Sequence, residues 1–150
     1  MAGEFILMEF TMNKLTKIPE SVAALIPCSQ LLITKQNLLA FQECIQRLEI
    51  ALKLCPGIGA TDGAKEHPCI FHYFCSSTDI FICEFNGTDE MFGYTILNGD
   101  LQNAEWGYTS LSSITKIPQF NIDYHFPIQT IEAALYNAYP EHYKKPQSLM

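Results

Sequence analysis

The sequence has few positive charges and no run of them. Nine basic residues stand against sixteen acidic ones, which gives a net charge of -7, and Arg47 is the one arginine. Proteins that bind nucleic-acid phosphates carry clustered Lys and Arg side chains, whereas Lys144-Lys145 is the only adjacent basic pair here. The composition therefore argues against a nucleic-acid-binding protein. Imitation of nucleic acid by an acidic surface is a less favoured alternative, because the acidic residues are scattered along the chain.

Long hydrophobic runs are also lacking. No apolar stretch approaches the roughly 18 residues that a membrane-spanning helix needs. The composition, with 48% hydrophobic and 17% charged residues, is that of a folded domain, and 150 residues suit one hydrophobic core. We expect a cytoplasmic protein with a single domain at 12–140 and a polar tail at 141–150. Residues 1–11 are interpreted as an expression leader, because Glu4-Phe5 and Glu9-Phe10 match the dipeptide that an EcoRI cloning site encodes.

The six cysteines lie in apolar patterns, and no secretory signal precedes them. We therefore expect reduced, buried thiols rather than disulfides. A zinc site made by His67, Cys69, His72 and Cys75 is the alternative. Because side chains alternate along a strand, Cys69 and Cys75 would point to one face and His72 to the other, which is poor tetrahedral geometry. The sequence therefore predicts no metal site.

Several short segments between Cys69 and Phe126 are typical of β-strands. They are rich in aromatic and β-branched residues, and turn residues separate them at hairpin spacing. The segments are 69–75, 80–85, 92–97, 105–108 and 121–126. The turn residues, such as Asn86-Gly87, have side chains that bond nearby backbone or a backbone that tolerates positive φ. The pattern predicts an antiparallel meander sheet of about five strands.

Helices are expected before and after the sheet. A short helix at 19–26, with Ser21 near its start, ends before Pro27, and Thr34 is the expected N-cap of a long helix that runs to Cys55. Its apolar positions are Leu38, Phe41, Ile45, Leu48, Leu52 and Cys55, spaced by three and four residues. This stripe either packs on the sheet, which we favour, or forms the seam of a homodimer. With a short C-terminal helix at about 130–139, the chain is predicted to be an α+β protein.

A set of motifs in the strand region is similar to one known family. The motifs are Phe71-His72-Tyr73-Phe74, Glu84-Phe85-Asn86-Gly87, Phe92-Gly93-Tyr94, Leu97-Asn98-Gly99-Asp100, Glu105-Trp106-Gly107-Tyr108 and Asp123-Tyr124-His125-Phe126-Pro127. In this order they resemble the bacterial domain of unknown function two-nine-five-eight and related domains of large polyvalent proteins from phages, plasmids and integrative elements. The resemblance covers about 69–135. It implies a bacterial or mobile-element accessory protein and carries no activity. Ile80 stands where the family usually has an aromatic residue, and the amino-terminal part at 12–66 is longer than is common in the family.

Acidic residues and one histidine lie in or beside the predicted strands. The candidates for catalysis are Glu84, Glu105, Asp123 and His125, since two carboxylates with different pKa values can act as general acid and base. We favour the simpler interpretation that these groups cap turns or face solvent. No thiol has a Cys-His-Asn arrangement that would activate it, and the glycine-containing loop at 57–63 lacks the Lys-Ser or Lys-Thr pair of a phosphate-binding loop. No cofactor is therefore predicted.

Aromatic side chains are the candidates for binding. They are Tyr73, Tyr94, Trp106 and Tyr108, and residues of these types often anchor protein interfaces. Because catalytic spacing is lacking, the sequence favours a non-enzymatic module that binds a protein, with no membrane partner. One alternative is a hydrolase or nucleic-acid-processing enzyme that uses carboxylates and histidine on the sheet. Another is a single-stranded nucleic-acid binder that stacks bases on the aromatic side chains, which the acidic balance disfavours.

Overall fold

The computed structural model describes residues 16–150, so the interpretation of 1–11 as a leader concerns residues outside the described part. The helices are α2 (Glu20–Ala23), α3 (Cys28–Gln36), α4 (Leu38–Leu54), α5 (Leu111–Thr115) and α6 (Ile131–Ala138), with the short 3-10 helix η1 (Gln147–Leu149). The strands are β1 (Pro68–Cys69), β2 (Phe71–Cys75), β3 (Thr78–Phe85), β4 (Glu90–Ile96), β5 (Glu105–Ser110), β6 (Asn121–Ile122) and β7 (Gln129–Thr130).

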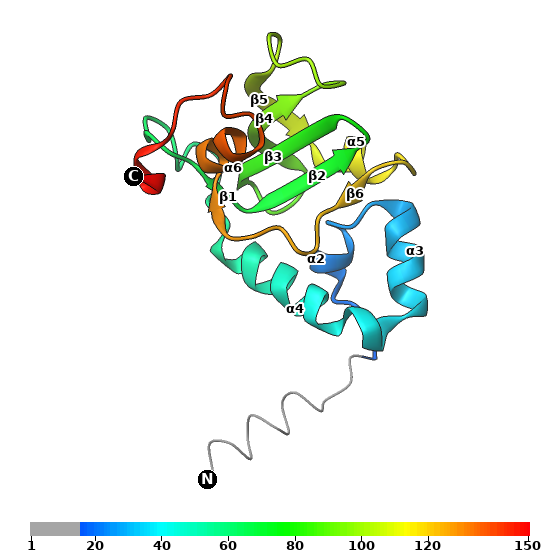
Figure 1. Ribbon diagram of the computed structural model, residues 1–150. Coiled ribbons are helices and arrows are strands. Elements are labelled where there is room, and N and C mark those ends of the chain that lie inside the picture. Colours follow the sequence, from blue (N-terminus) through cyan, green and yellow to red (C-terminus); the bar gives the residue numbers. More distant parts are fainter. Residues whose placement is uncertain (1–15) are drawn as a thin grey trace.

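The centre of the fold is a five-stranded sheet with the order β5-β4-β3-β2-β6 (Figure 1). Every pairing in it is antiparallel, and β1 and β7 form a separate two-stranded antiparallel sheet. The prediction of an α+β fold with an antiparallel sheet is therefore confirmed. The last predicted strand is much shorter than expected, because only Asn121 and Ile122 pair with β2.

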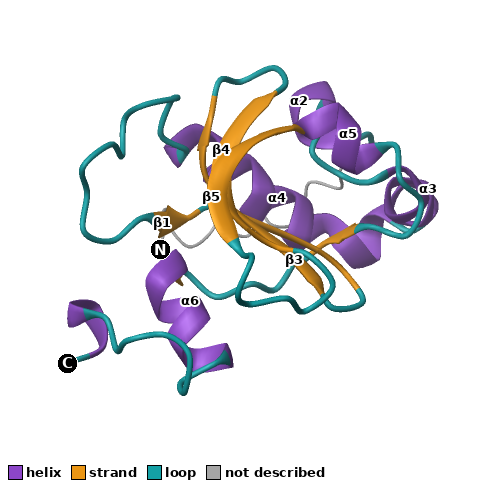
Figure 2. Ribbon diagram, turned by 90° about the horizontal axis from the view of Figure 1, so that it is seen from above, coloured by secondary structure: helices purple, strands orange, loops and turns teal. Residues whose placement is uncertain are grey.

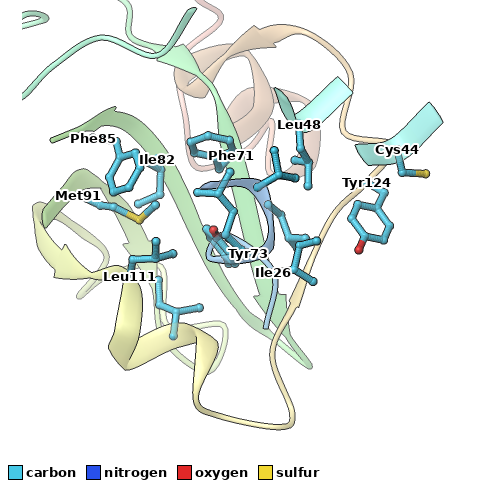
Figure 3. Close-up of a cluster of buried hydrophobic side chains, with 14 of the residues drawn as sticks. Ile26, Cys44, Leu48, Phe71, Tyr73, Ile82, Phe85, Met91, Leu111 and Tyr124 are labelled. Carbon is cyan, nitrogen blue, oxygen red and sulfur yellow. Dashed lines mark hydrogen bonds between the residues drawn. The ribbon is translucent and has the colours of Figure 1, made fainter. Parts of the chain in front are cut away.

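Both faces of this sheet are covered. On one face α2, α4 and α5 pack on Phe71, Tyr73 and Ile82, which lie in the larger hydrophobic cluster (Figure 3). On the other face α6 packs on Phe81 and Cys83 through Ile131 and Leu135, and Figure 2 shows this helix on the opposite side of the sheet from α2 and α5. Burial of apolar side chains on both faces stabilises the sheet between two helical layers.

The helix that precedes the sheet differs from the prediction at its start. Thr34 is not an N-cap. It lies inside α3, fully buried, where its hydroxyl donates to the carbonyl oxygen of Gln30 at 2.7 Å and lies 2.8 Å from the Tyr124 hydroxyl. The helix breaks at Asn37, whose φ of -134° and ψ of 46° are not helical, and α4 begins at the next residue. The apolar stripe of α4 packs into the larger cluster, as the favoured alternative predicted, so it is not available as a dimer seam.

The turns follow the sequence closely. Ser76, in the turn between β2 and β3, and Asn98, just after β4, adopt positive φ. The Asn86 side chain accepts hydrogen bonds from the backbone amides of Thr88, Asp89 and Glu90. The C-terminal helix α6 begins as predicted at Thr130, whose hydroxyl accepts from the amide of Ala133. In the Asn86 turn and at the start of α6, a side chain bonds to backbone groups within four residues, and this local bond is enough to specify the element.

The two outer edges of the sheet differ in whether their backbone groups have hydrogen-bond partners. At β6 the Gln30 side chain completes the edge: its Nε2 donates to the carbonyl oxygen of Ile122 at 2.9 Å, and its Oε1 accepts from the Ile122 amide at 2.8 Å. At β5, strand β4 is the only strand partner within residues 16–150. The sheet therefore has one filled edge and one open edge.

The segment after Pro140 contacts the domain. The Tyr143 hydroxyl lies 2.9 Å from the Tyr94 hydroxyl, and the Ser148 amide donates to Glu66 at 3.1 Å. These bonds hold the expected polar tail beside α6 and β4. Within the described residues, no helix has the length and apolar character needed to cross a bilayer.

Candidate functional site

One pocket brings together three of the candidate residues from the sequence. Glu84, Trp106 and Tyr108 line a cavity of about 360 Å³ between β5 and the loop at 57–64. The other lining residues are Gly59, Thr61, Asp62, Gly63, Ala64, His67 and Phe92. The pocket combines carboxylates, an imidazole and aromatic side chains, which is the composition of a ligand site rather than of a packing defect.

A β-bulge directs Glu84 toward this pocket. The register between β3 and β4 shifts between Ile82 and Glu84, so that Glu84 is paired with Phe92. Phe92 in turn is paired with Tyr108 on β5. Because a bulge inserts an extra residue into the alternation of a strand, Glu84 shares a face with Phe92 and Tyr108. The strand pattern alone did not predict this irregularity.

The Glu84 carboxylate is held by the loop that precedes the sheet. Its Oε1 accepts from the Gly59 amide at 2.7 Å, and its Oε2 accepts from the Thr61 amide at 2.9 Å and from the Thr61 hydroxyl. Only 3% of Glu84 is exposed. Burial alone would raise the pKa of Glu84, but the Thr61 hydroxyl, the two backbone amides and the nearby His67 together hold it below its usual value. The carboxylate is therefore ionised at neutral pH.

A second pair, His67 and Glu132, forms another wall. Oε2 of Glu132 lies 2.9 Å from Nδ1 of His67, and Oε1 accepts from the His67 backbone amide at 2.6 Å. The imidazole lies over Trp106, with a ring-centroid distance of 4.3 Å and an interplanar angle of 43°. In this contact the Glu132 carboxylate accepts a hydrogen bond from the tautomer of His67 that carries its proton on Nδ1. Within residues 16–150, no hydrogen-bond partner faces Nε2.

The sequence did not identify this pair as a site. His67 was considered only as a zinc ligand, and Glu132 lies 65 residues away in the first turn of α6. No local pattern could have joined them, since the contact depends on the pairing of β1 with β7.

The four aromatic candidates for binding fall into two groups. Trp106 is 36% exposed and Tyr108 is 67% exposed, and both lie against Phe92, with ring-centroid distances of 6.0 and 5.0 Å. Tyr73 is fully buried, and its hydroxyl donates to the carbonyl oxygen of Leu25 at 2.7 Å. Tyr94 is also buried. The prediction that all four offer a binding surface is therefore wrong for Tyr73, which lies in the larger hydrophobic cluster, and for Tyr94, which lies beneath Tyr143.

The four catalytic candidates do not meet. Glu105 is exposed and paired with Thr95, so it points to the sheet face opposite its neighbour Trp106. Asp123 lies near His72, with 3.6 Å between Oδ2 and Nδ1, and His125 is exposed beside α4. Glu84 is the one member of the set in the pocket. A hydrolytic site built from these four residues together is therefore not formed.

His72 lies next to Asp79 and Phe81 and does not line the pocket beside β5. Its Nε2 lies 2.7 Å from Oδ1 of Asp79, and its ring stacks on Phe81 at 4.7 Å with an interplanar angle of 9°. Its Nδ1 is buried without a hydrogen-bond partner. The backbone amide of Asp123 donates to the carbonyl oxygen of His72 at 2.8 Å. This cluster ties the segment after β6 to the sheet.

The zinc alternative is not supported by these positions. His67 is bonded to Glu132 and His72 to Asp79, while the Cys69 thiol donates to the carbonyl oxygen of Phe71 at 3.6 Å. Among residues 16–150, no three His, Cys, Asp or Glu side chains converge on a point where a metal ion could bind. All six cysteines are free; three are buried and Cys28 is exposed.

Comparison of the chain with protein-family models, with curated proteins and with solved structures gives no match. The resemblance over about 69–135 to the domain of unknown function stays a prediction.

Proposed function

We propose that the protein is a non-enzymatic interaction module that binds an extended segment of another protein along the outer edge of β5. The observation that carries this proposal is the exposure of Trp106 and Tyr108 on the outermost strand, at the mouth of a pocket. The wider role, an accessory protein of a bacterium or mobile element, follows only from the family resemblance.

The outer edge of β5 supports strand addition. An edge strand presents unpaired N–H and C=O groups, and partner segments that add a strand use them for main-chain hydrogen bonds. β5 spans Glu105–Ser110, and most of its residues are exposed or half-buried. Six residues are long enough to pair with one short partner strand.

Side chains beside this edge support specificity. In strand addition, pockets for alternate side chains of the partner determine which sequences bind. Trp106 and Tyr108 lie two residues apart on one face of β5, and the pocket opens between them and the loop at 57–64. Tyr and Trp give much contact area at small conformational cost, which makes them common interface anchors.

The test selects peptides from a random displayed library on the full chain and measures their binding to the purified protein. We expect selected peptides to lose at least about tenfold in affinity on Tyr108→Ala, the size expected for an interface anchor. Hydrogen exchange should show new protection of backbone amides in β5. Leu54→Ala, an exposed apolar residue on α4, is the matched control and should leave affinity unchanged.

Two outcomes would reject the proposal. One is that no peptide is selected that binds through β5. The other is that selected peptides bind Tyr108→Ala as well as the original chain, with new protection on α4 instead.

A second candidate function has one specific observation in its favour. Glu132 orients the His67 imidazole, whose Nε2 is left without a partner in the described chain while the ring lines the pocket. In an ester hydrolysis, Nε2 would take a proton from water as the water oxygen bonds to the acyl carbon. The same proton would then pass to the leaving alkoxide, which gives an acid and an alcohol.

A panel of chromogenic carboxylic and phosphoric esters tests this second function. If it is correct, His67→Gln lowers kcat/KM by about 100-fold or more, as removal of a general base does, whereas His125→Gln, at an exposed site, has no effect. Turnover that is absent, or equal in the two variants, eliminates it.

A further inference from the structure

The pocket beside β5 contains a negative charge that forms no ion pair with a lysine or arginine of residues 16–150. Glu84 is ionised, and only 3% of it is exposed to solvent. None of the ion pairs found in the described part of the chain includes it. Of the charged lining residues, Asp62 is a second carboxylate, and no lysine or arginine lines the cavity. A buried charge is costly unless it is paired or hydrogen-bonded. Here only hydrogen bonds to the loop and the neighbouring His67 offset it.

The carboxylate keeps capacity for another donor. Oε1 of Glu84 accepts one hydrogen bond, from the Gly59 amide, although a carboxylate oxygen has lone pairs for about two. The second oxygen already accepts from the amide and the hydroxyl of Thr61. A ligand that donates an N–H group to Oε1 would therefore complete the coordination of Glu84 without breaking the bonds that hold the loop.

The remaining walls are aromatic. Tyr108 leaves most of its ring accessible, and Trp106 and Phe92 are nearly parallel, with an interplanar angle of 17°. Aromatic faces attract cations, and a guanidinium group stacks on them while its N–H groups bind a carboxylate. The ammonium of lysine satisfies the charge but does not stack. An anionic group is excluded by Glu84 and Asp62.

We infer that this pocket binds an arginine side chain of the partner segment, with its guanidinium group between Glu84 and the exposed ring of Tyr108, beside Trp106. The inference rests on the proposed strand addition at β5, because the partner's side chain reaches the pocket from there. The net charge of -7 favours the approach of a basic segment.

Trp106 is the only tryptophan in the chain, so its fluorescence reports on this pocket. The experiment titrates the full chain with N-acetyl-arginine methylamide, its lysine analogue and its citrulline analogue, which is neutral and nearly isosteric with arginine. We expect saturable fluorescence changes with arginine, roughly three- to tenfold weaker binding of lysine, and at least tenfold weaker binding of citrulline. Equal affinity for arginine and citrulline would overturn the inference.

Three variants locate the site. Glu84→Gln should weaken arginine binding at least about tenfold, since a neutral amide replaces the ionised acceptor. Because this change also disturbs the loop, Tyr108→Leu and Asp62→Asn are the decisive variants, as both side chains are exposed. We expect each to weaken binding by about three- to tenfold. Glu105→Gln removes a carboxylate from the opposite face of the same strand and should have no effect.

The same probes separate this inference from the proposed function. Suppose that peptides protect β5 from exchange but bind with the same affinity whether they contain arginine or citrulline. This result would support strand addition and reject the arginine site. Suppose instead that the arginine methylamide changes the Trp106 fluorescence but no peptide protects β5 from exchange. This result would support the arginine site and reject strand addition. If neither probe changes the fluorescence or the exchange of β5, both are wrong.

Discussion

The backbone amide of Gly59 donates to Oε1 of Glu84 at 2.7 Å, across 25 positions of sequence. This bond, with those from Thr61, joins the loop at 57–64 to the bulge of β3. The loop and the strand that form the pocket are thus held by the same carboxylate that gives the pocket its charge.

Glu84→Gln is expected to destabilise the protein by about 1 to 3 kcal/mol, because an amide nitrogen replaces one of the two buried acceptor oxygens. Urea unfolding gives the free-energy difference. Glu105→Gln, an exposed change of the same chemistry, should remain within about 0.5 kcal/mol of the original chain. Equal stability of the two variants would contradict the role given to the Gly59 and Thr61 bonds.

Gly93→Ala is expected to be the more disruptive of two matched glycine substitutions in the sheet. A Cβ at Gly93 would lie 1.8 Å from the carbonyl oxygen of Phe81, whereas one at Gly107, its partner on β5, meets nothing within 4 Å. We expect a loss of about 3 kcal/mol or more for Gly93→Ala, since backbone must move, and less than about 1 kcal/mol for Gly107→Ala. Thermal unfolding of both variants measures the difference, and similar melting temperatures would refute it.

Acid should destabilise the fold. Burial raises the pKa of Glu84, but its hydrogen bonds lower that pKa by more than burial raises it. Hydrogen bonds from Ser148 and Thr130 lower the pKa of Glu66. A lowered pKa in the folded state means that the unfolded chain binds the proton more tightly. The two ionised carboxylates therefore stabilise the folded protein at pH values above their unfolded-state pKa of 4.5. Stability should fall as the pH decreases through 4.5 and below. Urea midpoints from pH 7 to 3 check this, and a midpoint that rises toward pH 3 would contradict it.

The thiols should differ in reactivity. Burial raises the pKa of Cys83 to about 11 and that of Cys55 to about 12, so both are almost entirely protonated at neutral pH. Cys28 is exposed and should be alkylated first by iodoacetamide at pH 8. Mass spectrometry of peptides after timed labelling measures the order. Labelling of Cys83 as fast as Cys28 in the native protein would show that the region around β3 opens readily.

The features that were predicted correctly are defined by neighbouring residues. The turn at Asn86 and the start of the C-terminal helix after Thr130 each depend on a side chain that bonds backbone within four residues. The alternation of apolar residues then places the strands between these turns.

The features that were missed depend on distant partners. Thr34 resembles a cap in sequence, but it is buried in α3 by a bond to Tyr124, which lies 90 residues later. The aromatic pattern predicts Tyr73 at the surface, but helices that are distant in sequence pack over it. The sequence names three residues of the pocket as candidates, Glu84 for catalysis and Trp106 and Tyr108 for binding, but it does not predict that they meet. His67 and Glu132 meet through strand pairing that no local pattern shows.

The Gln30 side chain, which completes the edge of β6, also limits how copies of the domain can assemble. Growth of an ordered fibre by sheet extension requires every subunit to offer two free edges, one for each neighbour. Here one edge is occupied by an amide that mimics a backbone strand. Sheet extension at β6 would have to displace Gln30 from Ile122, so pairing through the β5 edges alone would join two subunits and no more.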